Sequence, residues 1–412
     1  MAAPHRSSAE TEHHELVVVG GGLVGLSLAI AVAEAGLDVA VVDRDDPDVT
    51  VTPGFDGRAY AIAYGSRQAL AAIGLWEKMA AETSPILEIR VADDSAPLFL
   101  HYDHHEVGEQ PLGWMVEDRI LRRALLARAG ELPRLRHLAP LAVADVERSS
   151  AGALVRLADG RAIGARLVVA ADGKNSPLRQ AAGIRSVSWS YPQTGIVVTV
   201  RHQRPHEGVA VEHFLPAGPF AILPLTGNRS SIVWTERADL APRILALPAQ
   251  EFAAELGRRF GDFLGALEIL GPHWSYPLSF LHAERYIDER LALVGDAAHV
   301  IHPIAGQGLN LGLRDVAALA EVLVDARRLG LDIGDVQVLA RYQRWRRLDN
   351  WMLSVATDSL NRLFSNAIPP VKLARDLGLA AVNRMPPLKR LFMRHAMGVI
   401  GELPRLVRGE AL

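Results

Sequence analysis

Three carboxylates, Asp43, Asp172 and Asp296, each stand at the end of an apolar run of the sequence. A carboxylate that follows a buried strand can accept hydrogen bonds from ligand hydroxyl groups. Free N–H groups at the start of a following helix favour negative charge, such as that of a phosphate. These residue types predict a site for a ligand that carries hydroxyl and phosphate groups.

The first carboxylate belongs to a strand, glycine turn, helix and second strand within 15–43. Gly20 permits the tight turn, Gly22 lets a pyrophosphate approach the backbone, and Gly25 lets the helix pack on the strand. Asp43, about twenty residues beyond the glycines, would accept from a ribose hydroxyl. The pattern predicts a dinucleotide-binding βαβ unit, which both NAD and FAD use.

The third carboxylate opens the segment 295–315, GDAAHVIHPIAGQGLNLGLRD, which reads as a glycine-bearing loop followed by a helix. Gly306 and Gly308 allow close approach of the backbone to a ligand, and Pro303 stiffens the entry. Taken alone, the stretch could also be a surface loop that caps a buried helix.

The string HPIAGQGLNLGLRD in this segment resembles the second flavin motif of the class A FAD-dependent aromatic monooxygenases, and is most similar to the ubiquinone-biosynthesis hydroxylases. The string ADGKNSPLR, which contains Asp172, is similar to the Asp-Gly motif that serves flavin and nicotinamide binding in that family. The resemblance extends from about Leu16 into the C-terminal region. It implies FAD, with Asp43 on the adenosine ribose and Asp296 near the ribityl chain and pyrophosphate.

The resemblance further implies that Arg58 lies close to the flavin and that Arg119 reaches the cofactor. From its residue type alone, Arg58 suits a phosphate or an electron-rich ring, and a solvated loop arginine is equally open. Arg122 and Arg123 are expected on a solvated helix face. The expected cofactor-binding set is Gly20, Gly22, Gly25, Asp43, Arg58, Arg119, Asp172, Gly295, Asp296, Pro303, Gly306, Gly308, Leu309 and Asn310.

The reaction implied is hydroxylation of a polyprenylated phenol in ubiquinone biosynthesis, with O₂ and with NAD(P)H or another electron donor. Candidates for catalysis are Arg58 and His302, the latter for uptake of a phenol proton. His299 and His302 could equally be buried packing residues, and His282 is more typical of a strand face. No metal site is expected.

Two other functions stay open from the sequence. One is an FAD-dependent reductase or oxidase of a lipid-like or aromatic substrate, and the other is a non-catalytic flavin-containing member of a biosynthetic complex. The sequence has no second glycine fingerprint, so NAD(P)H is expected to dock transiently. Association with other ubiquinone-biosynthesis proteins is a further expectation from the resemblance.

The strands and helices that must position these residues predict an α/β fold. We expect a Rossmann-like FAD-binding fold with an inserted antiparallel β-sheet and a helical C-terminal region. Helices are expected at 114–128 and near 248–270, and a strand at 276–282. The expected ranges are a disordered tail at 1–14, an FAD-binding domain at 15–180 and 285–345, a β-rich substrate domain at 181–284 with contributions from about 80–115, and a helical, basic region at 346–412.

The composition excludes several classes of protein and of site. Among 412 residues, 44 basic and 47 acidic side chains give a net charge of −3, so no overall field attracts nucleic acid. The absence of cysteine excludes disulfides and thiolate metal sites, and it fits a reducing, cytoplasmic setting. No apolar run is long enough to span a membrane.

The last part of the chain differs from the rest in charge. Segment 361–412 holds nine Lys and Arg residues against three Asp and Glu residues. Leu388, Leu391 and Phe392 stand among Lys389 and Arg390, a mixture that suits a membrane surface, on the inner face of the membrane. The same helix could instead pack its apolar face on the protein, and both alternatives stay open.

Overall fold

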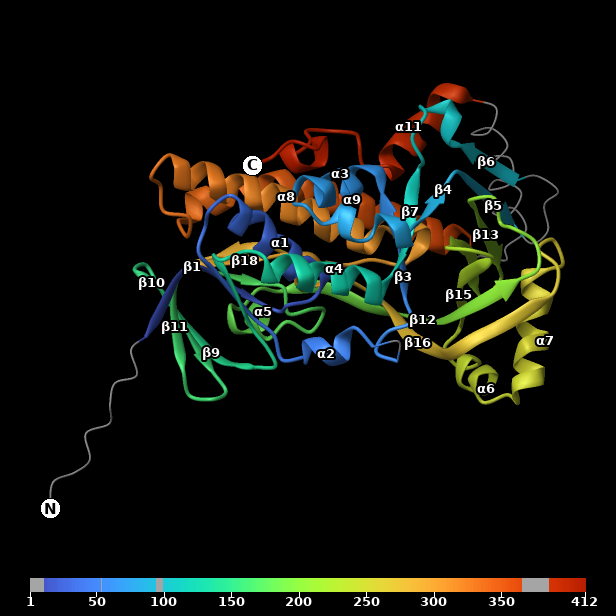
Figure 1. Cartoon of the computed structure of the whole chain (residues 1–412), viewed down its shortest axis with the longest axis horizontal. Helices are drawn as coiled ribbons and strands as arrows, with labels where there is room; N and C mark the ends of the chain where they lie inside the picture. Colours follow the sequence, from blue (N-terminus) through green and yellow to red (C-terminus); the bar gives the residue numbers. More distant parts are fainter. Residues whose placement is uncertain (1–10, 53, 94–98, 365–384) are drawn as a thin grey trace, which may run out of the picture.

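The computed structural model describes residues 11–52, 54–93, 99–364 and 385–412. Two large sheets lie side by side, with most of the longer helices gathered on one side of the first sheet (Figure 1). The predicted α/β class, with an inserted antiparallel sheet and a helical C-terminal region, is confirmed.

The first sheet forms the nucleotide-binding half of the molecule. Its strands β8, β2, β1, β11 and β18 are parallel neighbours, as expected where helical crossovers connect them. Residues 16–19 of β1 are buried, as in a strand with both faces covered. The strands are β1 (Glu12–Val19), β2 (Val39–Val42), β8 (Leu135–Leu138), β9 (Val143–Ser149), β10 (Gly152–Leu157), β11 (Ala162–Ala170), β17 (Ile287–Asp288) and β18 (Leu291–Leu293).

Helix α1 packs against α4 and α8, and α8 in turn packs against α9. Helix α1 is buried along nearly its whole length because its residues are almost all apolar or small. These helices are α1 (Leu23–Glu34), α3 (Tyr64–Ala72), α4 (Asp118–Gly130), α8 (Gln307–Arg328) and α9 (Val336–Phe364), and the shorter ones are α2 (Pro47–Thr50) and α5 (Pro177–Ala181).

The second sheet alternates its side chains between two environments, with the period of two expected of strands. Along β15, Ile232 and Trp234 pack towards α7, while Val233 and Thr235 line a cavity on the other face. In sheet order the strands are β19 (His299–Val300), β16 (Leu267–Ala283), β12 (Ser186–His202), β15 (Arg229–Arg237), β14 (Gly218–Leu225), β13 (Val209–Leu215), β5 (Glu88–Asp93) and β6 (Phe99–Asp103), and α6 (Ala241–Leu245) and α7 (Ala249–Phe260) follow β15 in the chain.

A small third sheet and a set of short helices connect these parts. The sheet contains β3 (Ala59–Ala63), β7 (Gly113–Glu117) and β4 (Ser84–Ile86). The 3₁₀ helices are η1 (Trp76–Lys78), η2 (Ala80–Glu82), η3 (His104–Glu106), η4 (Gly295–Ala297), η5 (Ile304–Gly306) and η6 (Arg405–Arg408), and α11 (Pro386–Ala396) belongs to the C-terminal region.

Several predicted boundaries were wrong, and strand pairing explains each difference. The predicted tail at 1–14 overlaps β1, because residues 12–14 pair with β11. The predicted helix at 114–128 is a strand up to Glu117, since this stretch pairs with β3 and β4. Strand β16 begins at Leu267, inside the stretch predicted as helical, because it pairs with β12 over a long register.

The described part of the chain contains no helix that is both long and apolar enough to cross a membrane. Residues 1–10 of the predicted tail lie outside the described residues, as do residues 365–384 of the basic region. The predicted division into domain ranges stays a proposal.

Candidate cofactor and substrate cavity

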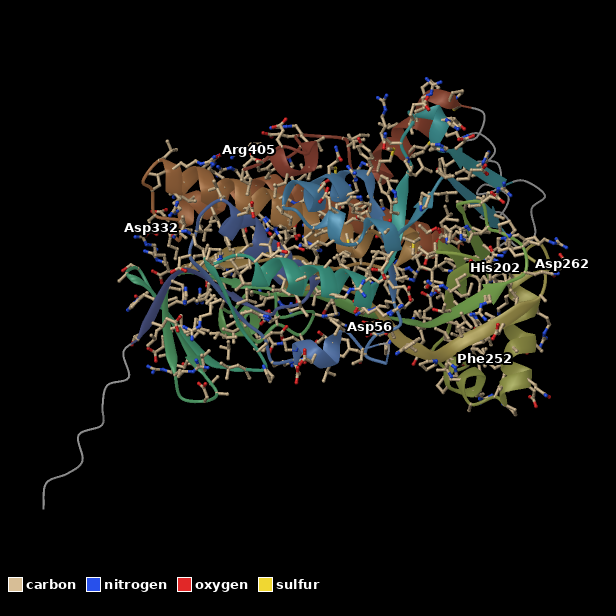
Figure 2. The ribbon with its side chains drawn as sticks, viewed as in Figure 1. Asp56, His202, Phe252, Asp262, Asp332 and Arg405 are labelled. Atoms are coloured by element: carbon tan, nitrogen blue, oxygen red, sulfur yellow. The ribbon has the colours of Figure 1, made fainter. Side chains whose placement is uncertain are left out.

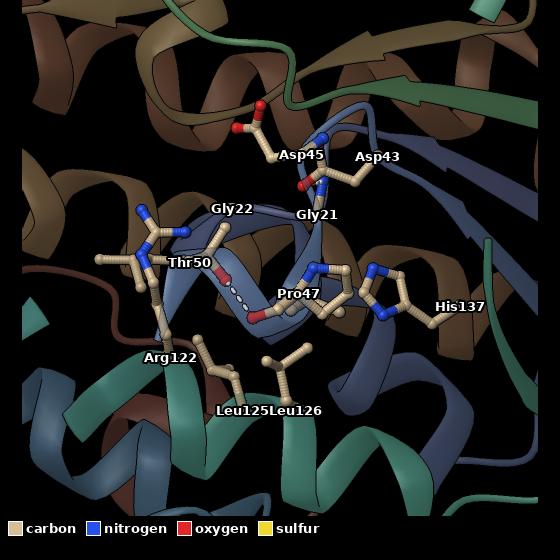
Figure 3. A pocket seen from close by; sticks show the side chains of 12 residues that line it. Gly21, Gly22, Asp43, Asp45, Pro47, Thr50, Arg122, Leu125, Leu126 and His137 are labelled. Carbon is tan, nitrogen blue, oxygen red and sulfur yellow. Dashed lines mark hydrogen bonds between the residues drawn. The ribbon is translucent and has the colours of Figure 1, made fainter. Parts of the chain in front are cut away.

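The glycine turn after β1 opens a small cavity at the start of α1 (Figure 3). Oδ2 of Asp43 accepts a hydrogen bond of 2.9 Å from N of Gly21, which fixes the carboxylate beside the turn. Gly22 occupies the N-cap position of α1 without a side-chain cap, so the first N–H groups of the helix are left for a ligand. His137 on β8 also lines this cavity, and its Nε2 is buried without a partner among the described residues.

The three predicted glycines of this turn have different environments. A Cβ on Gly25 would lie 1.9 Å from the carbonyl O of Gly20, so Gly25 is required for helix packing. Gly20 has a φ of +104°, which a residue with a side chain rarely adopts. A Cβ on Gly22 would meet nothing within 4 Å, and this open side faces both cavities described here.

A larger cavity of about 1280 Å³ continues from Gly22 between the first and second sheets. Single-ligand pockets usually have volumes of roughly 300–1,000 Å³, so this cavity has room for more than one bound group. Gly22, Leu23 and Arg122 line both cavities and therefore mark where they meet.

Arg122, rather than the predicted Arg119, is the arginine of α4 that lines the cavities. Its Nε lies 2.5 Å from Oδ2 of the buried Asp118 one turn earlier, which holds the guanidinium inward. A guanidinium nitrogen of Arg119 lies 3.6 Å from Oε2 of Glu117, and Arg119 lines neither cavity. The expectation that Arg122 belongs to a solvated face is wrong, because its ion pair with the buried Asp118 holds the side chain at the cavity wall.

The segment after β18 supplies one wall of the large cavity. Asp296 lines the cavity and forms no hydrogen bond or ion pair with any residue that the structure describes. Asp296 is exposed, and desolvation by the surrounding protein raises the pKa of its carboxyl. Pro303, Gly306, Gly308 and Leu309 also line this wall.

Helix α8 points its N-terminus at the same wall. Gly306 is its N-cap in the left-handed conformation, with a φ of 60° and no side-chain cap. Asn310, predicted to bind cofactor, joins α8 to β3: its Oδ1 accepts from N of Ala63 at 2.9 Å and its Nδ2 donates to O of Ala61 at 2.8 Å. Asn310 does not line the cavity.

The loop from Gly295 to His299 is held from behind by a buried network. Asp315 on α8 is fully buried and accepts hydrogen bonds from N of Gly295, Nε2 of His299, Nε of Arg346 and Nδ2 of Asn350, at 2.5 to 3.1 Å. Burial opposes ionisation, but the charge and hydrogen bond of His299 and the charge of Arg346 outweigh it and lower the pKa of Asp315 to about 2. Gly295 therefore shapes the loop without lining the cavity, while His299 does line it.

Arg58 lies at the cavity wall near the middle of the molecule, beside the Asp56 labelled in Figure 2. Its Nε donates to Oδ2 of Asp56 at 2.9 Å, and the guanidinium lies 5.0 Å from the ring centroid of Tyr276. The hydroxyl of Tyr276 also donates to Asp56, at 2.9 Å. Burial disfavours the charged carboxylate, but the hydrogen bond and charge of Arg58 outweigh it and lower the pKa of Asp56.

Asp172 does not line the cavity, although its neighbours Gly173 and Lys174 do. Its Oδ2 accepts a hydrogen bond of 3.3 Å from N of Leu178, which supports the first turn of α5. Its Oδ1 is buried without a partner among the described residues, and burial raises the pKa of the carboxyl. Lys174 lines the cavity and forms no ion pair within the described part of the chain.

His302, the predicted base, lies outside the cavity. It is fully buried at the contact of β12 with α9, where its Nε2 lies 3.3 Å from Oε1 of Gln193 and its ring packs 5.1 Å from that of Tyr191. Burial lowers its pKa to about 4. The buried packing role is therefore the one that fits, and His282, also buried, packs near Trp351.

The far lobe of the large cavity is apolar. The second sheet contributes Ala221, Leu223 and Val233 from the face opposite α7. Helix α11 closes the end, with buried Met393 and Met397 packed against Ile86, Leu112 and Met115. The remaining apolar lining includes Ile89, Val91, Leu100, Tyr102, Val197, Ala210, Phe214, Leu278, Leu363 and Phe392.

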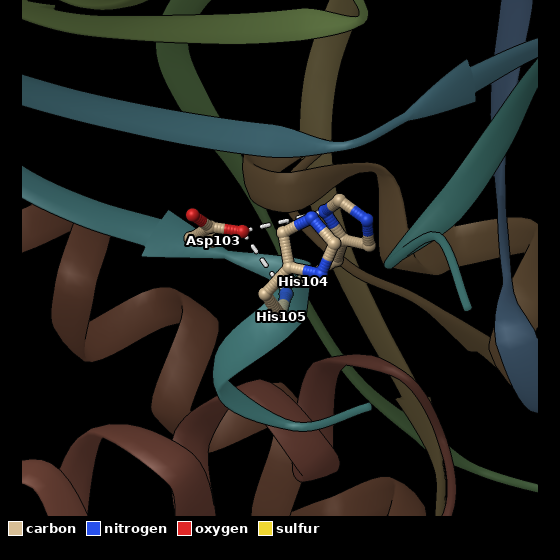
Figure 4. Close-up of side chains that lie close together, drawn as sticks. All are labelled: Asp103, His104 and His105. Atoms are coloured by element: carbon tan, nitrogen blue, oxygen red, sulfur yellow. Dashed lines mark hydrogen bonds and ion pairs between the residues drawn. The ribbon is translucent and has the colours of Figure 1, made fainter. Parts of the chain in front are cut away.

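A separate cluster of Asp103, His104 and His105 follows β6 (Figure 4). Oδ1 of Asp103 accepts from N of His105 at 3.0 Å, and Nδ1 of His104 lies 3.0 Å from O of Leu87. These hydrogen bonds account for the cluster as a turn, and we propose no metal site there.

The residues that line the two cavities fit an FAD molecule. An adenosine would meet Asp43 and the unpartnered His137, a pyrophosphate would meet the open side of Gly22, and the ribityl hydroxyls would meet the unpartnered Asp296. The isoalloxazine would then lie beside the N-terminus of α8. His137, Arg122 and Lys174 were not predicted, because only the fold brings them beside the motif residues.

Comparisons with known proteins agree with this fit. Residues 13–353 match the family described as FAD binding domain. The ubiquinone hydroxylase UbiL of Rhodospirillum rubrum is 56% identical, covering 97% of this chain and 93% of the relative. The 3-demethoxyubiquinol 3-hydroxylase of Escherichia coli is 35% identical, over 93% of this chain and 98% of the relative.

Among solved structures, p-nitrophenol 4-monooxygenase PnpA from Pseudomonas putida DLL-E4 has a TM-score of 0.79 at 20% identity. The match covers 94% of this chain and 99% of that one. At this identity the likeness shows a shared fold.

Proposed function

The chain belongs to the family of FAD-dependent ubiquinone-biosynthesis hydroxylases, and from this membership we propose that it hydroxylates the ring of a polyprenylated phenol with O₂ and NAD(P)H. The observation that carries the proposal is one continuous cavity that joins the unpartnered Asp296 to a long apolar lobe. A polar cofactor and a hydrophobic substrate would meet in that cavity.

Bound FAD would take electrons from NAD(P)H and activate O₂, so that one oxygen atom enters the ring and the other leaves as water. The carboxylate of Asp296 would accept hydrogen bonds from ribityl hydroxyls, and Gly22 and Arg122 would hold the pyrophosphate. The N–H groups at the start of α8 would stabilise negative charge on the flavin. The apolar strand faces exclude water from the ring and hold the substrate.

The reductant docks transiently in this proposal, because the chain has a single glycine fingerprint. Lys174 and Arg58, which line the cavity, are the cations that would meet a nicotinamide dinucleotide phosphate. The basic C-terminal region would bring the protein to a membrane surface, where a polyprenylated substrate resides.

Replacement of Asp296 tests the cofactor role. Asp296→Asn should give a folded protein whose FAD dissociation constant rises roughly 10- to 100-fold, because a hydrogen bond to a charged group contributes about 1.5–3 kcal/mol. Fluorescence titration of the apoprotein with FAD measures this, with Asp103→Asn outside the cavity as the control. Unchanged affinity would count against the assigned site.

The substrate class is tested in cells that lack the protein. We expect a prenylated phenol that lacks one ring hydroxyl to accumulate, and the wild-type chain to restore the pathway. Restoration by a variant that binds no FAD would contradict an FAD-dependent hydroxylation.

A further inference from the structure

The apolar lobe of the cavity reaches the protein surface at α11. Phe392 on α11 and Leu363 near the end of α9 both line the cavity, and they remain 46% and 37% exposed. A side chain that faces both the cavity and solvent marks an opening. Among the residues that the structure describes, the apolar lobe therefore has a mouth between these two residues.

The outward face of α11 combines apolar and basic side chains. Pro387, Arg390, Leu391 and Arg394 follow the helical spacing i, i+3, i+4 and i+7, so they lie on one face. All four are exposed, with Leu391 at 51%. Neither arginine forms an ion pair within the described ranges of the chain. The exposed Leu391 and Phe392 therefore lie beside basic side chains, the combination found in helices that bind at a membrane interface.

The inward face of the same helix fixes its position. Nζ of the buried Lys389 lies 2.5 Å from Oε1 of Glu106, and Met393 and Met397 pack in the apolar cluster at the end of the cavity. N of Gly65 also donates to O of Met397 at 2.8 Å. Because these contacts anchor the helix, the outward residues are free for another role.

We propose that α11 docks on an anionic lipid bilayer and that the cavity mouth opens into it. Leu391 and Phe392 would enter the interface between head groups and acyl chains, while Arg390 and Arg394 would meet lipid phosphates. A hydrophobic phenol then passes from the bilayer into the apolar lobe without crossing water. The route rests on the proposed function, whereas the docking surface rests on α11 itself.

Helix α9 provides a matched control surface. Leu348, Trp351, Met352 and Val355 form an exposed apolar stripe at helical spacing, and Leu348 is 64% exposed. None of these four lines the cavity. Exposure alone therefore does not distinguish the two surfaces, and continuity with the cavity favours α11.

The test uses the full-length, FAD-loaded protein and flotation with phosphatidylcholine vesicles, with or without phosphatidylglycerol. Arg390→Glu with Arg394→Glu should weaken binding to the anionic vesicles by at least about 30-fold, since each basic residue near such a surface contributes roughly fivefold and the substitutions also reverse the charge. Leu391→Asp should weaken binding to both compositions. The α9 double variant Leu348→Asp with Met352→Asp should change binding less than about twofold.

The proposal would be overturned if the wild-type protein did not bind anionic vesicles, or if the α11 variants bound them as tightly as the wild type. It would also be overturned if the α9 variant lost as much vesicle affinity as the α11 variants. A second readout separates this failure from failure of the proposed function. Hydroxylation of a short-tailed, water-soluble phenol should be unchanged in the α11 variants, whereas turnover of a long-tailed phenol held in vesicles should fall with binding. If the wild type hydroxylates neither phenol, the proposed function fails, while vesicle binding still tests the docking surface.

Discussion

The two ends of the long cavity are built in different ways. At the cofactor end, backbone turns meet the cavity, and polar groups such as Asp296 and Arg122 are placed by short-range motifs and by buried partners. At the α11 end, the walls are alternate residues of strands whose other faces pack elsewhere. The first arrangement fixes a particular ligand through hydrogen bonds, while the second accepts an apolar group through shape and exclusion of water.

Substitutions in the glycine turn should have the largest effect, and they test the cofactor end. Gly25→Ala places a Cβ 1.9 Å from a backbone carbonyl, so we expect a loss of more than about 4 kcal/mol of folding free energy. The Cβ added by Gly22→Ala would contact no other residue, so this variant should fold normally and yet bind FAD poorly. Thermal unfolding of each variant with and without FAD distinguishes a loss of folding stability from a loss of FAD binding. If both variants showed the same change in unfolding temperature, the assignment of Gly25 to packing and of Gly22 to the ligand would be contradicted.

Asp315→Asn should have the next largest effect, because four donors converge on this carboxylate. An amide would turn a donor towards one of them, at a cost of roughly 3–5 kcal/mol for a broken buried charge pair. Chemical denaturation measures this loss. The surface variant Asp159→Asn serves as the control, and a loss below about 1 kcal/mol would show that the network does not hold the loop.

Ala221→Phe tests the apolar end, since it adds a ring to a strand face that lines the cavity. We expect FAD affinity to stay within about twofold of wild type, while kcat/KM for a long-tailed phenol falls at least about tenfold, or roughly 1.4 kcal/mol. Loss of FAD together with activity would show that the two ends are not independent.

The effect that is smallest at neutral pH concerns His302, which belongs to neither end. Its native pKa of about 4 lies below its usual 6.5, so between these values the unfolded chain binds the proton and the native chain does not. Stability should therefore fall as the pH is lowered through this window, by up to about 1.4 kcal/mol per pH unit for this group. The pH dependence of unfolding should be flatter in His302→Gln, and an unchanged slope would show that His302 is not held neutral.

The cofactor end was more accessible to prediction from the sequence than the apolar end. Gly22, Asp43, Asp296 and the start of α8 follow from local patterns, because a turn between strand and helix is a short-range structure. Arg119 and His302 do not line the cavity, and no local pattern indicates this. The role expected for Arg119 rests on the family resemblance and stays a prediction.

The apolar lobe depends on sheet pairing between distant segments, which no local pattern specifies. Strands β5 and β6 join the second sheet through the parallel pairing of β5 with β13, far along the chain. The face of each strand that meets the cavity, and the closure of its end by α11, follow only from that pairing. Composition did indicate that the C-terminal region is unusual, but not which of its residues meet the cavity.

The central claim is that FAD bound beside Asp296 directs one oxygen atom of O₂ into a phenol held in the apolar lobe. The most direct measurement is mass spectrometry of the product formed by the purified protein with FAD, NAD(P)H and a prenylated phenol under ¹⁸O₂. The account predicts a product heavier by a single ¹⁸O atom on the ring, formed in lower yield by Asp296→Asn at FAD concentrations below the raised dissociation constant of that variant. Oxidation of NAD(P)H without ring labelling, or a label derived from water, would contradict it.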